Sequence, residues 1–515
     1  MDICVQLEQH RIFLFILVCA KGYIEKQYRN VSTNTTLTLT AKTQQISHAT
    51  ATTSTSPTSS PMATLALAHW ATDLTPSSLP APILQAALRS LYNYTGCAIA
   101  GSNHPTTLKA HTALAPFSPN SSPSHLLGQP SSTLSAPLAA LLNGIASHVH
   151  DYDDTHLATI IHPTGPVASA LLSYATHISP PQTISGAELL AALAAGIEAA
   201  CKLGLAVWPT HYSTGWHITS TTGSIGAAVA VGKLMKLPAR QLAHAIGLAA
   251  TQVTGLREMF GSDCKSLHVG RAAESGFMAA ALAQKGFTSS TEALEAKRGW
   301  CRVVVGGGEE GERAVERLGE LVGELGREWE VEKNAFKPFP CGIVCHAAID
   351  GCVQLHEDGV EVGEIERVEA RVHPLVMELT AKKEPKDGLE AKFSVFHGAA
   401  VGLLFGKAGP AEYADEVVRD AEVVAVREKI EAKADEGIAA DEAHLKVHLA
   451  GGRVVVKHVQ HAVGSLNRPM TDEQLERKFV DQVKLVLGEA KAKEVSDLAW
   501  GIADSPDVAA VINAI

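Results

Sequence analysis

The sequence is poor in the features that mark several protein classes. Aromatic residues make up 5% of its 515 residues, the formal charge is −11 at pH 7, and the nine cysteines form no Cys-x-x-Cys pair. A net acidic chain without a Lys/Arg stripe repels phosphate backbones, so nucleic acid is not an expected partner. No apolar run approaches the roughly 20 residues that a membrane helix requires, so no membrane partner is expected either.

One group of cysteines could still hold a metal ion. Cys341, Cys345 and Cys352 lie close together in the chain, next to His346. Zinc sites usually show tighter knuckle spacing and a second pair of ligands elsewhere. We therefore interpret these cysteines as small buried side chains in a reduced compartment and expect no metal.

The N-terminal segment differs in composition from the rest. Residues 31–61 are dominated by Ser, Thr and Pro and cannot bury a core. Residues 1–61 therefore form a disordered leader, a targeting segment, or an extension ahead of a true start at Met62. The apolar stretch Ile12–Ala20 is short for a signal peptide and is followed by polar residues, so the expected location is cytoplasmic or mitochondrial.

The remaining chain is long enough for two domains. Apolar residues and abundant Ala and Gly recur at helical spacing across residues 62–330, which predicts a large all-helical domain. Pro238 is expected in the first turn of one of these helices. Residues 331–465 predict a smaller α+β lid domain, and residues 466–515 predict C-terminal helices that return to the helical domain. The fold class is therefore mainly α with an α+β lid.

Three local signals mark elements in the second half of the chain. Residues 365–372 (IERVEARV) alternate like a half-buried strand. Residues 445–459 predict a hairpin, with Gly451-Gly452 at the turn. Thr471 and Gln474 have the spacing of a capping box at the start of a helix.

A glycine pattern after Val303-Val304-Val305 has the spacing of a dinucleotide-binding fingerprint. Gly306, Gly308 and Gly311 supply the glycines. The fingerprint needs a strand before it and a helix N-terminus that attracts phosphate, whereas Glu309 and Glu310 place carboxylates there. We expect a loop leading into a helix and no dinucleotide site.

Five polar segments stand out from the Ala-rich background. The densest is residues 148–156, His-Val-His-Asp-Tyr-Asp-Asp-Thr-His, where three Asp and three His are costly to bury unless they pair or bind something. Apolar segments flank it, so it falls at the boundary of a core helix, where perturbed acids and bases concentrate. The other four segments carry His217 after Gly215-Trp216, Lys265 with His268 and Arg271, Lys337 with His346, and His373 with Lys392 and His397.

These segments in this order resemble the MmgE/PrpD family. The matching motifs are D-x-D-D-T (151–155) with His162-Pro163, G-W-H (215–217), K-x-L-H-x-G (265–270) and F-K-x-F-P (336–340). The family includes 2-methylcitrate dehydratase, cis-aconitate decarboxylase and iminodisuccinate epimerase. The resemblance implies a helical domain with an α+β lid, a site between them, no metal, no organic cofactor, and a homodimer.

The resemblance also implies the residues of the site. Asp151, Thr155, His162, His217, Lys265 and Lys337 fall at active-site positions of the decarboxylase pattern. His162 and His217 are expected to be the acid–base pair, because an imidazole titrates near neutrality. Asp151 is expected to orient an imidazole and Thr155 to assist by hydrogen bonding. The substrate's carboxylates are expected to be held by Lys265, Lys337 and, where it faces inward, Arg271.

Three functional interpretations remain open from the sequence. The first is a lyase that decarboxylates or dehydrates cis-aconitate, citrate, methylcitrate or a longer alkylcitrate. The second is an epimerase or isomerase of a dicarboxylate such as iminodisuccinate, and the third is a non-catalytic helical binding protein. Decarboxylases of the family carry an active-site Tyr in the segment that here reads RVHPLVMEL (371–379), where this sequence has none. That difference counts against decarboxylation in particular.

Overall fold

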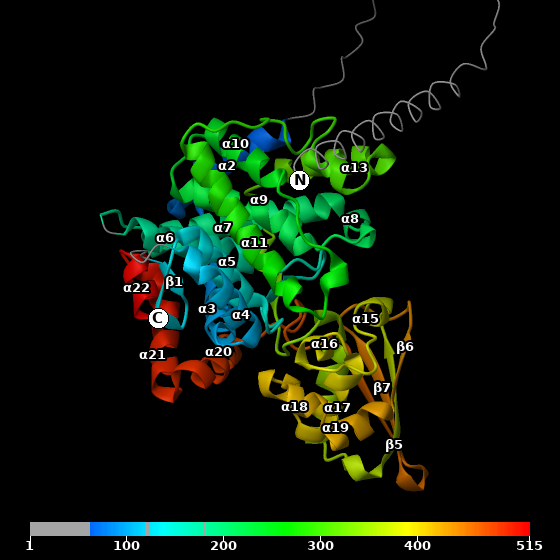
Figure 1. Ribbon diagram of the computed structural model, residues 1–515. Coiled ribbons are helices and arrows are strands. Elements are labelled where there is room, and N and C mark those ends of the chain that lie inside the picture. The colour runs from blue at the N-terminus through cyan, green and yellow to red at the C-terminus, as the bar shows by residue number, and fades with distance from the viewer. Residues whose placement is uncertain (1–61, 119–123, 180) are drawn as a thin grey trace, which may run out of the picture. The chain divides into compact units, whose positions relative to one another are not determined.

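The computed structural model of the chain describes residues 62–118, 124–179 and 181–515 (Figure 1). The predicted leader, residues 1–61, lies outside these described residues. Helices dominate the described residues, and the strands are short and concentrated in the C-terminal half. The predicted class, mainly α with a smaller α+β part, is confirmed.

The first part of the described chain is built from helices that pack on one another. They are α2 (Ala63–Asp73), α3 (Ala81–Ser102), α4 (Pro105–Leu114), α5 (Ala136–His148), α6 (Thr164–Ile178), α7 (Gly186–Val207), α8 (Thr210–Thr214), α9 (Ile218–Leu234), α10 (Ala239–Ala250), α11 (Asp263–Gln284), α12 (Trp300–Val304) and α13 (Gly308–Gly323). Two short antiparallel pairs accompany them, β1 (Ser124–Leu126) with β2 (Gln129–Leu134) and β3 (Asp154–His156) with β4 (Asn334–Phe336).

Glycines let the central helices approach backbone to backbone. A Cβ on Gly144 of α5 would lie 2.7 Å from the Cα of Gly270 on α11, closer than a Cβ can come. A Cβ on Gly196 of α7 would likewise lie 2.7 Å from the carbonyl oxygen of Gly226 on α9. Dense packing of this kind leaves little freedom for helices to shift. It fixes α11, which carries Lys265, and α5, which ends three residues before Asp151.

Helix α7 corrects the expectation that no apolar run is long enough to cross a membrane. It has 22 residues with a mean hydropathy of 1.7 in its most apolar window, so it is long and apolar enough by composition. That window is 94% buried within the protein, and α7 packs against α9, α13 and α3. Helix α7 is therefore a core helix. The expectation from the sequence did not allow for a core helix that is buried on all sides and so is apolar all round.

The lid domain places helices on one small sheet. Its elements are α14 (His346–Glu357), β5 (Ile365–Val372), α15 (Pro374–Leu379), α16 (Gly388–Ala391), α17 (Val395–Phe405), α18 (Asp415–Val418), α19 (Ala421–Glu428), β6 (Ile430–Ala434), β7 (Ala443–Leu449) and β8 (Val454–Val459). The strand order is β6-β5-β7-β8, with β5 parallel to β6 and antiparallel to β7. Helix α14 packs against α17 and against β7 and β8.

The local sequence signals in this half are confirmed. Strand β5 spans the predicted residues 365–372, and β7 and β8 form the predicted hairpin, with φ of 74° at Gly451 and 78° at Gly452. Thr471 and Gln474 form both halves of a capping box at the start of α20. Pro238 differs by one position, because it is the N-cap of α10 and the helix begins at Ala239.

Hydrophobic residues form two main cores. Along the sequence, the chain contributes to the larger core, then to the second core, and then to the larger core again. The larger core contains residues from Ala63 to Phe336 and again from Met470 to Ile515. The second contains residues from Phe339 to Ala462 and belongs to the lid domain. The returning helices are α20 (Asp472–Leu487), α21 (Glu489–Trp500) and α22 (Val508–Ala514); α20 packs on α3 and α22 on α6 (Figure 1).

The glycine-rich segment has no dinucleotide-binding architecture. Residues 300–304, which precede the glycines, form helix α12, where the fingerprint requires a strand. Helix α13 (Gly308–Gly323) begins within the glycine pattern itself, and Glu309 and Glu310 lie in its first turn. Those carboxylates complement the helix dipole and leave no place for a phosphate group.

Candidate active site

A two-stranded pairing joins the D-x-D-D-T motif to the F-K-x-F-P motif. Strand β3 pairs antiparallel with β4, and Asp154 lies opposite Phe336. This pairing places the turn before β3, which carries Asp151, beside Lys337, which directly follows β4. The pairing closes a separation of 186 residues between Asp151 and Lys337.

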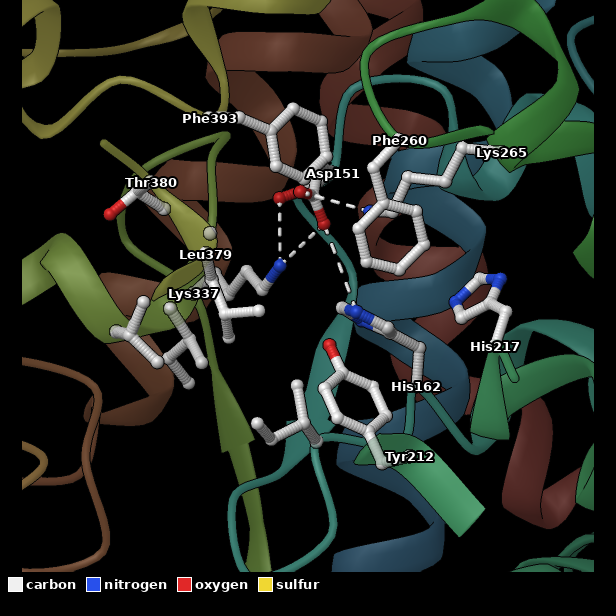
Figure 2. Close-up of a pocket in the computed structure, with 14 residues that line it drawn as sticks. Asp151, His162, Tyr212, His217, Phe260, Lys265, Lys337, Leu379, Thr380 and Phe393 are labelled. Atoms are coloured by element: carbon white, nitrogen blue, oxygen red, sulfur yellow. Dashed lines mark hydrogen bonds and ion pairs between the residues drawn. The ribbon is translucent and has the colours of Figure 1, made fainter. Parts of the chain in front are cut away.

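Asp151 lies between two ammonium groups. Lys337 Nζ donates to Asp151 Oδ1 at 2.6 Å and to the Asp151 carbonyl at 3.1 Å, and Lys265 Nζ lies 3.0 Å from Oδ2 (Figure 2). All three side chains are buried. Burial alone would raise the pKa of Asp151, but Lys265 and Lys337 hold it well below its usual range. The carboxylate is therefore ionised and bridges both cations.

The backbone at Asp151 supports this bridge. Its φ is +52°, a left-handed conformation that residues other than Gly seldom adopt. Such conformations persist where the surroundings over-determine them and cluster at functional sites. Here the two lysines hold the side chain and the main-chain carbonyl of Asp151 together.

One ring nitrogen of His162, Nδ1, contacts the surrounding protein, and the other, Nε2, faces Asp151. Its Nδ1 lies 2.9 Å from the Asp154 carbonyl oxygen, 3.3 Å from Asp153 Oδ1 and 3.3 Å from Thr155 Oγ1. A carbonyl oxygen can only accept, so Nδ1 carries the proton. Nε2, the other ring nitrogen, lies 3.8 Å from Asp151 Oδ1. His162 thus presents Nε2 on the pocket side.

His217 lies at the N-cap of α9, on the other side of the pocket from the lid. Its Nδ1 lies 3.0 Å from Nδ1 of His268 on α11. Burial first, then the neighbouring His268 and Lys265, hold the pKa of His217 well below its ordinary value. His217 is therefore a neutral imidazole at neutral pH.

These side chains line one narrow pocket between the helical domain and the lid domain. The cavity volume is about 40 Å³. The polar part of the wall is Asp151, His162, Tyr212, His217, Lys265, Lys337 and Thr380, and the apolar part is Ile160, Phe260, Gly342, Ile343, Val344, Leu379 and Phe393. The lid domain contributes the residues from 342 onward. The pocket thus offers two cations and two imidazoles inside a largely apolar enclosure.

Two aromatic rings flank the ammonium group of Lys265. Its Nζ lies 5.4 Å from the Phe260 ring centroid and 5.2 Å from that of Phe393, and the two rings are stacked with centroids 5.5 Å apart. A cation is attracted to the face of an aromatic ring. Phe393 comes from the lid domain, so the lid helps to position a cation that the helical domain carries.

The structure brings five of the seven predicted site residues into this pocket. Asp151, His162, His217, Lys265 and Lys337 line it. Thr155 is buried behind His162 and touches its Nδ1, so it contacts the imidazole and not the cavity.

Arg271 does not meet the condition set for it, that it faces inward. Its side chain is 47% exposed and pairs with Glu274, three residues further along α11. Six residues separate it from Lys265, which amounts to a rotation of about 240° around the helix. Arg271 therefore faces away from the pocket.

Replacing Arg271 with Ala is expected to leave catalysis unchanged. An exposed residue with a single local ion pair changes stability by no more than about 0.5 kcal/mol. Steady-state kinetics on an acid that the wild type turns over should give kcat and KM within about two-fold of the wild type. A loss beyond about ten-fold in kcat/KM would place this side chain back in substrate binding.

The sequence analysis assigned a role to Asp151 but none to Asp153 or Asp154, the other aspartates of the D-x-D-D-T motif. Asp153 Oδ2 lies 2.8 Å from His148 Nδ1, and its Oδ1 faces His162. Asp154 accepts from Thr164 at 2.6 Å and from Asn334 at 2.8 Å, and burial raises its pKa to about 7. Asp153 thus orients imidazoles, while Asp154 ties β3 to α6 and β4.

Tyr212 also escaped the sequence prediction. It lies in the short helix α8, is buried, and points its hydroxyl into the space that His162 and Lys337 also line (Figure 2). Burial raises the pKa of Tyr212 to about 12, so the hydroxyl stays a neutral donor. Its position five residues before His217 was the only sequence signal available, and such spacing is common.

Side chains that could together hold a metal ion lie beside the pocket and not at the cysteines considered in the sequence analysis. Cys341 and Cys345 are buried with sulfurs 3.6 Å apart, and no set of three metal-capable groups forms around them among the described residues. Such a set does form from His148, Asp151, Asp153 and His162. Both Asp151 oxygens already contact ammonium groups there, so lysine supplies the positive charge.

Comparison with known proteins shows which family the sequence matches. A family model of the MmgE/PrpD N-terminal domain matches residues 65–312, and one of the MmgE/PrpD C-terminal domain matches residues 339–502. A protein of Aspergillus oryzae named as cis-aconitate decarboxylase-like is 24% identical over 88% of this chain and 97% of its own length. A cis-aconitate decarboxylase of Aspergillus terreus is 23% identical over 87% of this chain and 94% of its own length.

A further relative matches only a part. The 2-methylcitrate dehydratase of Salmonella typhimurium is 32% identical over 22% of this chain and 24% of its own length. The two family models together cover most of the chain from residue 65 to residue 502. The chain therefore belongs to the MmgE/PrpD family.

Proposed function

We propose that the protein is a lyase that acts on a small tricarboxylic acid. The first candidate reaction is decarboxylation of an acid like cis-aconitate, and the second is dehydration of an acid like citrate or 2-methylcitrate. The observation that carries this proposal is the Asp151 carboxylate, bridged by Lys265 and Lys337 within 3.8 Å of the free nitrogen of His162. A pocket that holds one carboxylate beside an acid–base group can hold another on the substrate.

The two lysines supply the binding energy for carboxylates. Each charge-assisted hydrogen bond contributes about 1.5–3 kcal/mol. Burial lowers the pKa of Lys265, whereas for Lys337 the nearby Asp151 outweighs burial and raises the pKa. Lys337, with two contacts to Asp151, is the more firmly held cation, and Lys265 is the one freer to turn to a substrate.

The two histidines supply the proton transfers. His162, held at Nδ1 by Asp154, Asp153 and Thr155, presents Nε2 as a base on the pocket side. His217 lines the pocket from α9, with Nδ1 occupied by His268 and Nε2 left for a ligand. Fixed imidazoles of this kind contribute typically 100- to 10,000-fold to a rate.

Both candidate reactions balance with these groups. In decarboxylation the bond between carbon and one carboxylate breaks, carbon dioxide leaves, and the electron pair moves into the adjacent unsaturated acid. A protonated imidazole then adds a proton at carbon. In dehydration an imidazole removes a proton from the carbon next to a carboxylate, and the hydroxyl leaves as water after a proton is donated to it.

Two observations bear on the choice between them. Two relatives that match over most of this chain are named as a cis-aconitate decarboxylase-like protein and a cis-aconitate decarboxylase, whereas the dehydratase match covers 22% of it. In this sequence the lid segment 371–379 places Leu379 at the pocket where a lid tyrosine would be sought. Tyr212 offers the pocket a phenolic hydroxyl from the helical domain instead, and we assign it the role of donor to the substrate.

Replacing Tyr212 with Phe is expected to lower kcat/KM by about 10- to 100-fold. The hydroxyl would donate to a charged substrate group, and losing such a bond costs about 1.5–3 kcal/mol. The measurement is steady-state kinetics together with a thermal melt, in which the ring packing should keep stability near the wild type. Tyr174→Phe, a buried tyrosine on α6 outside this pocket, is the matched control. Equal kinetics in both variants would remove Tyr212 from the proposal.

One assay tests the proposed function. Purified protein is incubated with citrate, 2-methylcitrate, cis-aconitate and iminodisuccinate, and the product masses are read. Loss of carbon dioxide or of water supports the lyase and identifies which reaction it catalyses. Unchanged mass with altered stereochemistry would replace it with an epimerase. No change with any of the four acids, for protein that melts cooperatively, would favour the non-catalytic binding protein.

A further inference from the structure

His268 belongs to the K-x-L-H-x-G motif but does not line the pocket. It lies on α11, three residues after Lys265, and is buried behind His217. Its Nδ1 lies 3.0 Å from Nδ1 of His217. On the far side of the ring, Nε2 lies 3.6 Å from the sulfur of Cys264, which is half-buried. Three side chains with exchangeable protons, those of His217, His268 and Cys264, thus form a path from the pocket toward the surface.

Close packing by Gly255 holds the two rings at this distance. The residue has a φ of +102°, and its carbonyl accepts from the His217 amide at 3.0 Å. A Cβ at this position would lie 3.2 Å from His217 Cβ and 3.3 Å from His268 Cγ. A side chain there would crowd Ser220 as well as both histidines, which would have to shift by a few tenths of an ångström. The contact between them is therefore part of the fold and not a chance of two rotamers.

A hydrogen bond between two Nδ1 atoms carries a single proton. When His217 is the donor, its Nε2 is unprotonated and faces the pocket as a base, while His268 carries its other proton on Nε2, toward Cys264. When His268 is the donor, His217 carries its other proton on Nε2 and faces the pocket as an acid. The same neutral pair therefore exists in a base form and an acid form of His217.

We propose that His268 is a positioning residue that relays protons between His217, which lines the pocket, and the half-buried Cys264. The proposal rests on the proposed function, in which His217 exchanges a proton with the substrate. When Nε2 of His217 takes a proton from the substrate, its Nδ1 proton passes to Nδ1 of His268. The Nε2 proton of His268 then leaves toward Cys264 and solvent. The reverse sequence delivers a proton to the substrate, and no net charge stays on either ring.

The surroundings explain why His217 needs such a partner. The groups that face the pair are Lys265 on the same helix, His148 at the end of α5 and His162 before α6. Burial and these neighbours hold the pKa of His217 well below its ordinary value, and burial with Lys265 lowers the pKa of His268 to about 4. A lasting imidazolium beside the Lys265 ammonium group is disfavoured, whereas a relay through neutral rings avoids it.

The test replaces His268 with Asn. The amide can keep a hydrogen bond to Nδ1 of His217, but it cannot pass a proton through, because it has no second tautomer of comparable stability. We expect kcat to fall by about 10- to 100-fold, with KM changed by less than about three-fold. The dependence of kcat on the fraction of D₂O should change from a curve that requires more than one transferring proton to a straight line. His244→Asn, on α10 outside the pocket, is the matched control.

A second measurement does not depend on activity. Nitrogen-15 NMR of histidine-labelled protein should show the Nδ1 resonances of His217 and His268 coupled through a shared proton, and the His268→Gln variant should lose that coupling. Absent coupling in the wild type overturns the relay even if the enzyme is active. Unchanged kcat and an unchanged D₂O profile in His268→Asn overturn it as well. Wild-type protein that shows the coupling but turns over none of the four acids refutes the proposed function and leaves the shared-proton pair standing.

Discussion

Replacing His162 with Asn is expected to reduce kcat by at least about 100-fold while KM changes by less than about three-fold. The Asn amide can take over the contact of Nδ1 with the Asp154 carbonyl, so the loop should keep its conformation. What disappears is Nε2, the nitrogen that faces Asp151. The measurement is steady-state kinetics of the purified variant, with a thermal melt to show that the fold persists.

A histidine outside the pocket gives the comparison for this variant. His125 lies on β1 and does not line the pocket, so His125→Asn should keep kcat within about two-fold. If His162→Asn turned over substrate at a similar rate, the assignment of this imidazole as the acid–base group would be wrong. A loss confined to KM would instead assign it to substrate binding.

Replacing Lys337 with Met should cost both stability and activity. Asp151 would keep only Lys265, and removing one partner of a buried ion pair destabilises a protein by about 3–5 kcal/mol. Activity on a tricarboxylate should fall by at least about ten-fold, because a cation that holds a carboxylate is gone. Urea unfolding and steady-state kinetics measure the two effects.

The pH dependence of this loss has a defined sign. The pKa of Asp151 in the folded protein lies below its unfolded value, so the bridge stabilises the protein above the unfolded pKa. The stabilisation is lost as the pH falls through the folded pKa of Asp151. The deficit of Lys337→Met should therefore be complete at neutral pH and should shrink in acid. A deficit that grew in acid would contradict the bridge.

Two further variants separate stability from catalysis. Adding Asp151→Asn to Lys337→Met removes the unpaired carboxylate and should recover part of the stability without recovering activity. Lys202 forms a buried pair with Glu330 outside the pocket, so Lys202→Met should lose stability with kcat/KM unchanged. If both lysine variants lost activity in proportion to stability, the effect of Lys337→Met would be structural only.

Local elements were predictable because their signals are local. The capping box at Thr471 and Gln474 needs two side chains three residues apart, and both reach each other within one turn. The β7–β8 hairpin depends on the positive φ that Gly451 and Gly452 adopt at its turn. Helix α7 was judged less well, because whether an apolar helix lies in a membrane or in a core depends on neighbours that the sequence does not place.

The site was predictable in its residues but not in its arrangement. The ordered motifs pointed to Asp151, His162, His217, Lys265 and Lys337, and the structure gathers them in one pocket. The pairing of β3 with β4 that achieves this joins segments about 180 residues apart, and no local pattern announces it. The direction of a side chain on a helix is equally hard to assign from a motif, which is why the sequence left open whether Arg271 faces inward.

The partners of the site residues lay beyond the sequence for the same reason. Asp151 was expected to orient an imidazole, and its Oδ1 does lie 3.8 Å from His162 Nε2. It also bridges two lysines, which the sequence did not indicate, while Asp153 and the Asp154 carbonyl contact the Nδ1 side of His162. Adjacent aspartates on an irregular turn point in different directions, so their roles follow from the fold and not from their order.

The most direct test of the central claim measures deuterium at carbon. The protein and its His162→Asn variant are incubated with each of the four acids in D₂O, and the carbon-bound deuterium is read by NMR. Decarboxylation and epimerisation place a solvent proton on the carbon next to a carboxylate, and dehydration does so in its reverse direction. We predict deuterium on that carbon with at least one of the acids for the wild type and at least about 100-fold slower uptake for the variant. Equal uptake in both proteins, or none in either, would contradict a pocket in which lysines hold a carboxylate and His162 moves the proton beside it.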